Sequence, residues 1–132
     1  QSAIQYVINN PLFGYGAGSF TEIFKLQTGF WKGHAHNLPL ELMVSYGVPA
    51  GLLIIIPIVL LLILAIKKLF KKNTFKKELI FDKAWIVSLF VLISSQLVDI
   101  QYFDGRISIL VWILLSGTKN IITDKSIKYQ QK

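Results

Sequence analysis

The sequence has no cysteine, and this absence excludes disulfide bonds, thiolate nucleophiles and cysteine-ligated zinc sites. Acidic side chains are scarce, with 7 Asp and Glu against 14 Lys and Arg, and no carboxylate cluster that would suit a hard metal ion is visible. The opening stretch QSAIQYVINNPLFGYG has neither a charged segment nor a long apolar one, so no secretory signal peptide is visible. Because the chain begins with Gln1 rather than Met, we expect it to be the C-terminal piece of a longer protein.

Apolar residues, by contrast, are abundant: they make up 53% of the chain, and the mean hydropathy is +0.54. Residues 48–66 carry no charge and would span about 28 Å as a helix, close to the roughly 30 Å hydrocarbon core of a bilayer. Shorter apolar runs cover 84–98 and 107–117, and flanking residues can extend each of them. We therefore predict an all-α membrane protein with about three transmembrane helices, one at 48–66 and a hairpin at 84–122, rather than a soluble protein with a buried helical hairpin.

Basic residues are distributed unevenly around these runs. Eleven lie between the first and second runs or after the third: Lys67, Lys68, Lys71, Lys72, Lys76, Lys77, Lys83, Lys119, Lys125, Lys128 and Lys132. Only Lys25, Lys32 and Arg106 lie elsewhere. The positive-inside rule then predicts a cytoplasmic loop at 67–83 and a cytoplasmic tail at 123–132. It places residues 1–47 and the turn 99–106 together on the outer face.

This distribution also explains the net charge of +7 without nucleic acid. The most basic stretch, KKLFKKNTFKK, is interrupted only by apolar residues typical of a membrane interface. It lacks side chains placed to stack on bases or read them. We therefore expect membrane lipid as a partner and no nucleic acid.

The outer segment contains the stretch FGYGAGSF, in which Gly14, Gly16 and Gly18 alternate. This spacing is compatible with a nest of backbone N–H groups around a phosphate. The alternative, which we favour on local grounds, is a tight loop that needs positive φ angles and close packing. The dinucleotide-binding and P-loop patterns are absent. A short helix is expected before Pro11, because the residue preceding a proline is disfavoured in helical geometry.

His34 and His36 come just before a short helix predicted at 38–46. As a metal pair they lack a third ligand nearby, since Glu41 is the only close candidate. They are otherwise a solvated loop pair, or a general base or hydrogen-bond donor near neutral pH. Asn37 is suited to cap the short helix, and the helix dipole favours the Glu41 anion in its first turn.

Gly47, Pro49 and Gly51 predict a break between this short helix and the span at 48–66. Arg106, in the outer turn, could contact an anionic lipid group through its guanidinium. The alternative, which we favour, is an ion pair with Asp104 or Asp99 that holds the turn in place.

Three stretches in order, NNPLFGYGAGSF, HAHNLPLEL and YGVPAGLL, resemble the C-terminal part of the bacterial O-antigen ligase/polymerase family. The resemblance covers about 3–53, and the D…DGR…W hairpin that follows also fits the last spans of the family. It implies a multi-spanning, GT-C-like glycosyltransferase of the bacterial inner membrane whose active face is periplasmic. Such enzymes transfer a glycan from undecaprenyl diphosphate to a hydroxyl acceptor, which is a lipid A core sugar, another lipid-linked glycan or a protein hydroxyl.

The family's essential histidine corresponds to His36, the one followed by Asn37. The resemblance calls for no cofactor and no metal, and the family arginines that grip the lipid diphosphate would lie upstream of this chain. We take His36 as catalytic. The candidates for substrate binding are Asn37, Arg106, Gly16 and Gly18, and the candidate accessory residues are His34, Glu41, Asp99 and Asp104.

A rival from another class is a non-enzymatic membrane protein, such as a transporter fragment or an assembly subunit. Transporters usually place polar sites near the middle of the bilayer. The predicted spans have few polar groups there, the exceptions being Ser94, Ser95 and Gln96. The clustering of reactive side chains at the outer face favours surface chemistry on an amphiphilic substrate.

Overall fold

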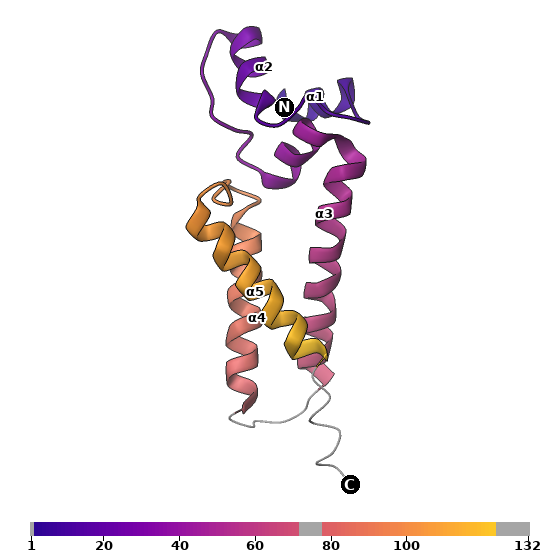
Figure 1. Ribbon diagram of the computed structural model, residues 1–132, viewed down its shortest axis with the longest axis vertical. Coiled ribbons are helices and arrows are strands. Elements are labelled where there is room, and N and C mark those ends of the chain that lie inside the picture. The colour runs from indigo at the N-terminus through magenta and orange to yellow at the C-terminus, as the bar shows by residue number, and fades with distance from the viewer. Residues whose placement is uncertain (1, 72–77, 124–132) are drawn as a thin grey trace.

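The computed structural model describes residues 2–71 and 78–123, which form five helices and no strand. The helices are α1 (Ser2–Asn9), α2 (Ser19–Thr28), α3 (Leu38–Lys71), α4 (Glu78–Ser95) and α5 (Gly105–Thr123). The predicted all-helical architecture is confirmed over this part of the chain. Helices α1 and α2 lie at one end with the first turns of α3 and the turn between α4 and α5, whereas the long parts of α3, α4 and α5 run away from that end (Figure 1).

Among the described residues, two helices are long and apolar enough to cross a membrane, α3 over Leu38–Leu69 and α5 over Gly105–Thr123. Helix α4 is apolar from Ala84 onward, but its first turns carry Glu78, Asp82 and Lys83. The third span expected at 84–98 is therefore not among these candidates, and the number of spans stays a prediction. The predicted loop at 67–83 is shorter, because α3 continues to Lys71 and α4 begins at Glu78. Residues 72–77 and the tail after Thr123 lie outside the described residues.

A break inside α3 separates its short first segment from the long one, as predicted. Gly47 has φ 85° and ψ 165°, a backbone region that is essentially confined to glycine. The loop 11–16 lies across this break and supplies partners for the interrupted helix ends. Three backbone hydrogen bonds fasten it there: Val48 N–H to Pro11 O at 2.7 Å, Tyr15 N–H to Val44 O at 2.8 Å and Gly16 N–H to Ser45 O at 2.9 Å.

Glycine is required where this loop touches the break. A Cβ on Gly14 would lie 2.5 Å from the carbonyl oxygen of Val44, and a Cβ on Gly47 would clash with the carbonyl group of Leu12. Gly14 and Gly16 also have positive φ angles of 64° and 102°. The tight-loop interpretation of FGYGAGSF is therefore the one that the packing supports.

Helix α2 was not anticipated from the sequence. Its Phe20, Ile23 and Phe24 face a small core with Tyr6 of α1 and Val44 of α3. Gly29 ends the helix in a left-handed conformation, φ 75°, and its N–H donates to Lys25 O at 2.9 Å. The aromatic spacing and the terminal glycine are ordinary helix signals. This core holds α2 against the start of α3 and so fixes both ends of the loop 30–37, which connects the two helices.

The three long helices share a second core. Leu62, Leu89 and Leu114 are buried against one another. The indole N–H of Trp85 donates to Leu114 O at 3.0 Å, and Gly117 makes room for the ring, since a Cβ there would clash with it. At the far end, the ammonium group of Lys68 donates to the last carbonyls of α5, those of Ile121 and, at 3.0 Å, Ile122. A cation is well placed at the negative end of a helix dipole.

Candidate functional site

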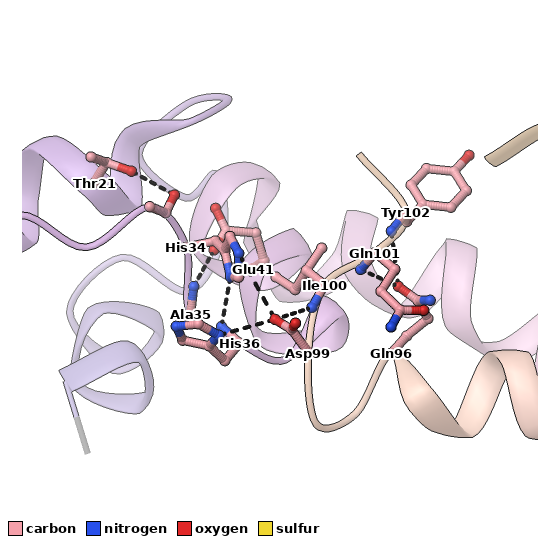
Figure 2. Close-up of polar contacts among 11 residues, drawn as sticks. Thr21, His34, Ala35, His36, Glu41, Gln96, Asp99, Ile100, Gln101 and Tyr102 are labelled. Atoms are coloured by element: carbon pink, nitrogen blue, oxygen red, sulfur yellow. Dashed lines mark hydrogen bonds and ion pairs between the residues drawn. The ribbon is translucent and has the colours of Figure 1, made fainter. Parts of the chain in front are cut away.

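The loop that leads into α3 has an unusual shape at His36. Its φ angle of 54° lies in the left-handed region, which few residues other than glycine adopt. Two hydrogen bonds hold the backbone in this shape: the Ala35 N–H donates to the Glu41 carboxylate at 2.9 Å, and the His36 N–H donates to Nδ1 of His34 at 3.2 Å (Figure 2). Glu41 is only 3% exposed. It therefore acts as a fixed internal acceptor that shapes the histidine loop.

Asn37 ends this loop and begins α3. Its side-chain oxygen accepts the Leu40 N–H at 3.0 Å, which confirms the predicted helix cap. Its side-chain amide donates to Leu97 O at 2.9 Å, in the turn between α4 and α5. The next backbone N–H, that of Leu38, donates to Gln96 O at 2.9 Å. The histidine loop is thus fastened to a turn about sixty residues further along the chain.

That turn is organised by Gln96, which is 2% exposed. The residue comes directly after the last residue of α4, Ser95, where the helix gives way to the turn. Its side-chain oxygen accepts the N–H groups of Gln101 at 3.1 Å and Tyr102 at 3.0 Å (Figure 2). The two backbone N–H groups thus have a hydrogen-bond acceptor although they lie beyond the helix. The bonds fold the turn toward the end of α4, and Asp99 then faces the histidine loop.

Asp99 joins both histidines. Its Oδ1 lies 3.0 Å from Nδ1 of His36 and 3.9 Å from Nε2 of His34, and the two imidazole rings meet edge to face at 4.3 Å between centroids. The same oxygen accepts the Ile100 N–H at 2.9 Å. The hydrogen bond from His36, and after it the one from Ile100, hold the pKa of the Asp99 carboxyl below its usual value. Asp99 is therefore an anion at neutral pH.

These contacts fix the tautomer of His36. A carboxylate anion can only accept, so the proton in the His36–Asp99 hydrogen bond belongs to Nδ1 of His36. Neutral His36 then keeps a lone pair on Nε2. The His36 side chain is 49% exposed, so the ring is open to solvent. The arrangement is that of a base oriented by a carboxylate, as in the general logic of catalytic triads.

The other candidate residues have different surroundings. Asp104 caps α5, because its carboxylate accepts the Arg106 N–H at 2.8 Å. Arg106 itself is exposed, and over residues 2–71 and 78–123 its guanidinium forms no ion pair, so the expected pairing with Asp104 or Asp99 is wrong. The Gly16 N–H is already donated to Ser45 O, so the expected phosphate contact has no free amide there. Gly18 has φ 71° and open space around it, directly before α2.

Sequence reasoning missed the pairing of Asp99 with the histidines and the role of Gln96. Topology alone put the outer turn on the same face as His36, but three charged residues of that turn were equally eligible to meet it. The choice depends on how the turn is curled. The sequence offered one signal, the glutamine at position 96 at the end of an apolar run. If the side-chain amide of such a residue is buried, it must find hydrogen-bond partners nearby.

No family model matches the chain, and neither the curated proteins nor the solved structures that were searched contain a match.

Proposed function

We propose that this chain forms the outer-face catalytic part of a glycosyltransferase of the O-antigen ligase or polymerase type. The enzyme transfers a glycan from undecaprenyl diphosphate to a hydroxyl acceptor at the periplasmic face of the bacterial inner membrane, with the C-terminus in the cytoplasm. The resemblance carried by the glycine loop, the H-N motif and the following Y-G-V-P-A-G stretch suggests this reaction. Two helices apolar enough to span a membrane are consistent with it.

One observation carries the proposal: the H-N histidine is paired with a carboxylate. The hydrogen bond of 3.0 Å between Nδ1 of His36 and Asp99 leaves Nε2 as an acceptor. The strained backbone of His36 and the buried Glu41 that helps to shape the loop argue that this orientation is maintained at a cost in stability. A solvated loop histidine would need neither.

The chemistry follows from this orientation. The acceptor oxygen forms a bond to the anomeric carbon of the donor sugar, while the bond from that carbon to the phosphate oxygen breaks and the diphosphate leaves with the electron pair. Nε2 of His36 takes the acceptor proton, and the Asp99 anion stabilises the resulting imidazolium. A positioned base of this kind contributes about 10²–10⁴-fold to a rate.

The leaving diphosphate also needs positive charge nearby. Arg106 lies at the start of α5, in the segment that follows Asp99, and its guanidinium has no ion-pair partner among the described residues. We assign it to contact with the anionic lipid headgroup. The arginines that the family uses for the diphosphate would lie upstream of this chain, and the acceptor is one of the three that the resemblance allows.

The test compares variants of the intact membrane protein in cells that lack the native enzyme, with surface glycan measured at equal membrane expression. We expect His36→Ala to lower transfer by about 10²-fold or more. Asp99→Asn should lower it less: it leaves the base but removes the anion that stabilises the imidazolium, and its amide can accept or donate, so the tautomer of His36 is no longer fixed. Asp104→Asn is the matched control: it makes the same change in the same turn, and asparagine still caps a helix. Transfer by His36→Ala at the wild-type rate would refute the proposed function.

A further inference from the structure

We propose that His34, His36 and Asp99 form a binding site for a divalent transition-metal ion of the Zn²⁺ type. The site shares His36 and Asp99 with the proposed transfer reaction, but the ion plays no part in that reaction, which calls for no metal. From the sequence the two histidines lacked a third ligand, and Glu41 was the only close candidate. The fold turns Glu41 away to hold the Ala35 N–H and brings Asp99 to the histidines from 63 residues away.

The spacing of the donor atoms suits a small ion. One ligand atom from each of the three side chains lies within 4.8 Å of the others. Two of the separations are 3.0 Å and 3.9 Å. Ligands about 2.0–2.1 Å from a tetrahedral zinc ion lie roughly 3.3 Å apart, so these separations bracket the required value. All three side chains are at least partly exposed, so they can adjust and leave positions open for water.

The surroundings of the cluster are organised rather than loose. The Ile100 N–H donates a hydrogen bond to Oδ1 of Asp99 and so orients the carboxylate. Carboxylates that ligate a metal commonly accept such a hydrogen bond. The histidine loop and the turn are joined by the Asn37 amide and the Leu38 N–H. The ligands therefore come from two segments that are already fixed relative to each other, and little ordering is needed when an ion binds.

Binding requires a change of tautomer in both histidines. Nδ1 of His34 now accepts the His36 N–H at 3.2 Å, so neutral His34 carries its proton on Nε2. For Nε2 to ligate, that proton must move to Nδ1, and the long, exposed hydrogen bond from His36 is given up. His36 ligates through Nδ1, and its proton moves to Nε2. Both imidazoles stay neutral, and the two histidine nitrogens and one carboxylate oxygen face the ion.

The donor set identifies the class of ion. Imidazole nitrogen suits Zn²⁺ and its neighbours in the first transition row, whereas Mg²⁺ and Ca²⁺ require mainly oxygen ligands. Two histidines and one carboxylate with open positions is a ligand set that both zinc and iron enzymes use. The site offers only one carboxylate, so the hard ions should not compete.

An occupied site would switch off the proposed base, and this consequence rests on the proposed function. With the ion on Nδ1, the proton of His36 resides on Nε2, which then donates a hydrogen bond instead of accepting a proton. Metal binding and base catalysis by His36 are therefore mutually exclusive. Zn²⁺ would inhibit transfer in proportion to its occupancy.

Binding itself is the test, because it does not depend on transfer. The intact protein in lipid nanodiscs, freed of metal with a chelator, is titrated with Zn²⁺ by calorimetry, alone and in excess Mg²⁺. We expect His34→Ala and Asp99→Asn each to raise the Kd for Zn²⁺ at least about tenfold. The Asp104→Asn control should match wild type, and Mg²⁺ should not displace the bound ion.

The outcomes separate this proposal from the proposed function. Equal affinity in wild type and His34→Ala, with unchanged helical circular dichroism, would refute the metal site and leave the His36 base untouched. The same holds if Asp104→Asn weakens binding as much as Asp99→Asn, because the turn would then be acting as a diffuse charge. Weaker binding in the two ligand variants alone supports the site, whatever the activity of the protein.

Discussion

Asn37 makes two hydrogen bonds that substitution can separate. Its oxygen caps α3 through the Leu40 N–H, and its amide donates to Leu97 O in the distant turn. Asn37→Ala removes both bonds. Loss of an N-cap costs about 1 kcal/mol, and loss of an ordinary hydrogen bond costs about another 1 kcal/mol. We therefore expect the free energy of unfolding to fall by about 2 kcal/mol.

Asn37→Asp removes only the second bond. Its carboxylate still accepts the Leu40 N–H, and the helix dipole favours the new anion by about 0.5 kcal/mol. The lost donor costs about 1 kcal/mol, since the freed Leu97 carbonyl is exposed and can be hydrated. The net change in stability should be within about 0.5 kcal/mol. The contact between the histidine loop and the turn is nevertheless weaker by about 1 kcal/mol, because the bond to Leu97 O is lost. If the proposed transfer requires this contact, its rate should fall roughly fivefold.

The assay measures two quantities on each variant: thermal unfolding in nanodiscs by circular dichroism, and glycan transfer at equal expression. Asn37→Ala should be impaired in both, and Asn37→Asp in transfer alone. Wild-type transfer by Asn37→Asp would refute the reasoning, because Asp99 would then stay opposite His36 without this bond. If Asn37→Asp and Asn37→Ala lowered the free energy of unfolding equally, the cap would contribute little to stability.

Substitutions at three further positions test the frame around the site, each by the free energy of unfolding in nanodiscs. Gly47→Ala should lose about 3 kcal/mol, because its backbone region is closed to alanine and the new Cβ meets the Leu12 carbonyl; an effect below 1 kcal/mol would mean that the break relaxes. Gln96→Leu should lose about 2 kcal/mol by stranding two turn amides, whereas Gln96→Glu, which keeps the acceptor, should lose much less; equal losses would count against the acceptor role. Lys68→Met should lose about 1–2 kcal/mol by freeing the last carbonyls of α5, and an unchanged unfolding midpoint would contradict that contact.

Much of the fold was predictable because its signals are local. Pro11 ends α1 nearby, Asn37 caps α3, and Gly47 breaks it, and each of these features depends on a few neighbouring residues. Helix α2 was predictable by the same standard, since its aromatic spacing and Gly29 were visible in the sequence. The number of membrane spans is harder to predict, because the charges at the start of α4 lie between the lysine-rich stretch of the sequence and an apolar run.

The site was predictable only in outline. The positive-inside rule brings residues 1–47 and the outer turn to one face, but it cannot say which carboxylate meets His36. That choice follows from the buried Gln96, which curls the turn, and from Asp104, which is committed to capping α5. The expected Arg106 ion pair failed for the same reason: both carboxylates already have backbone or histidine partners. Long-range polar choices of this kind depend on geometry that no short pattern encodes.

The separation of 63 residues between His36 and Asp99 also sets the order in which the parts of the site are made. At about 5–20 residues per second, the ribosome adds Asp99 roughly 3–13 s after His36. During that interval the histidine loop has Glu41 but neither Asp99 nor the turn to join. The pair can form only after the α4–α5 hairpin has been synthesised and packed beside α3. The His36–Asp99 pair is thus a sign of completed assembly, and nascent chains that stall before residue 99 cannot form it.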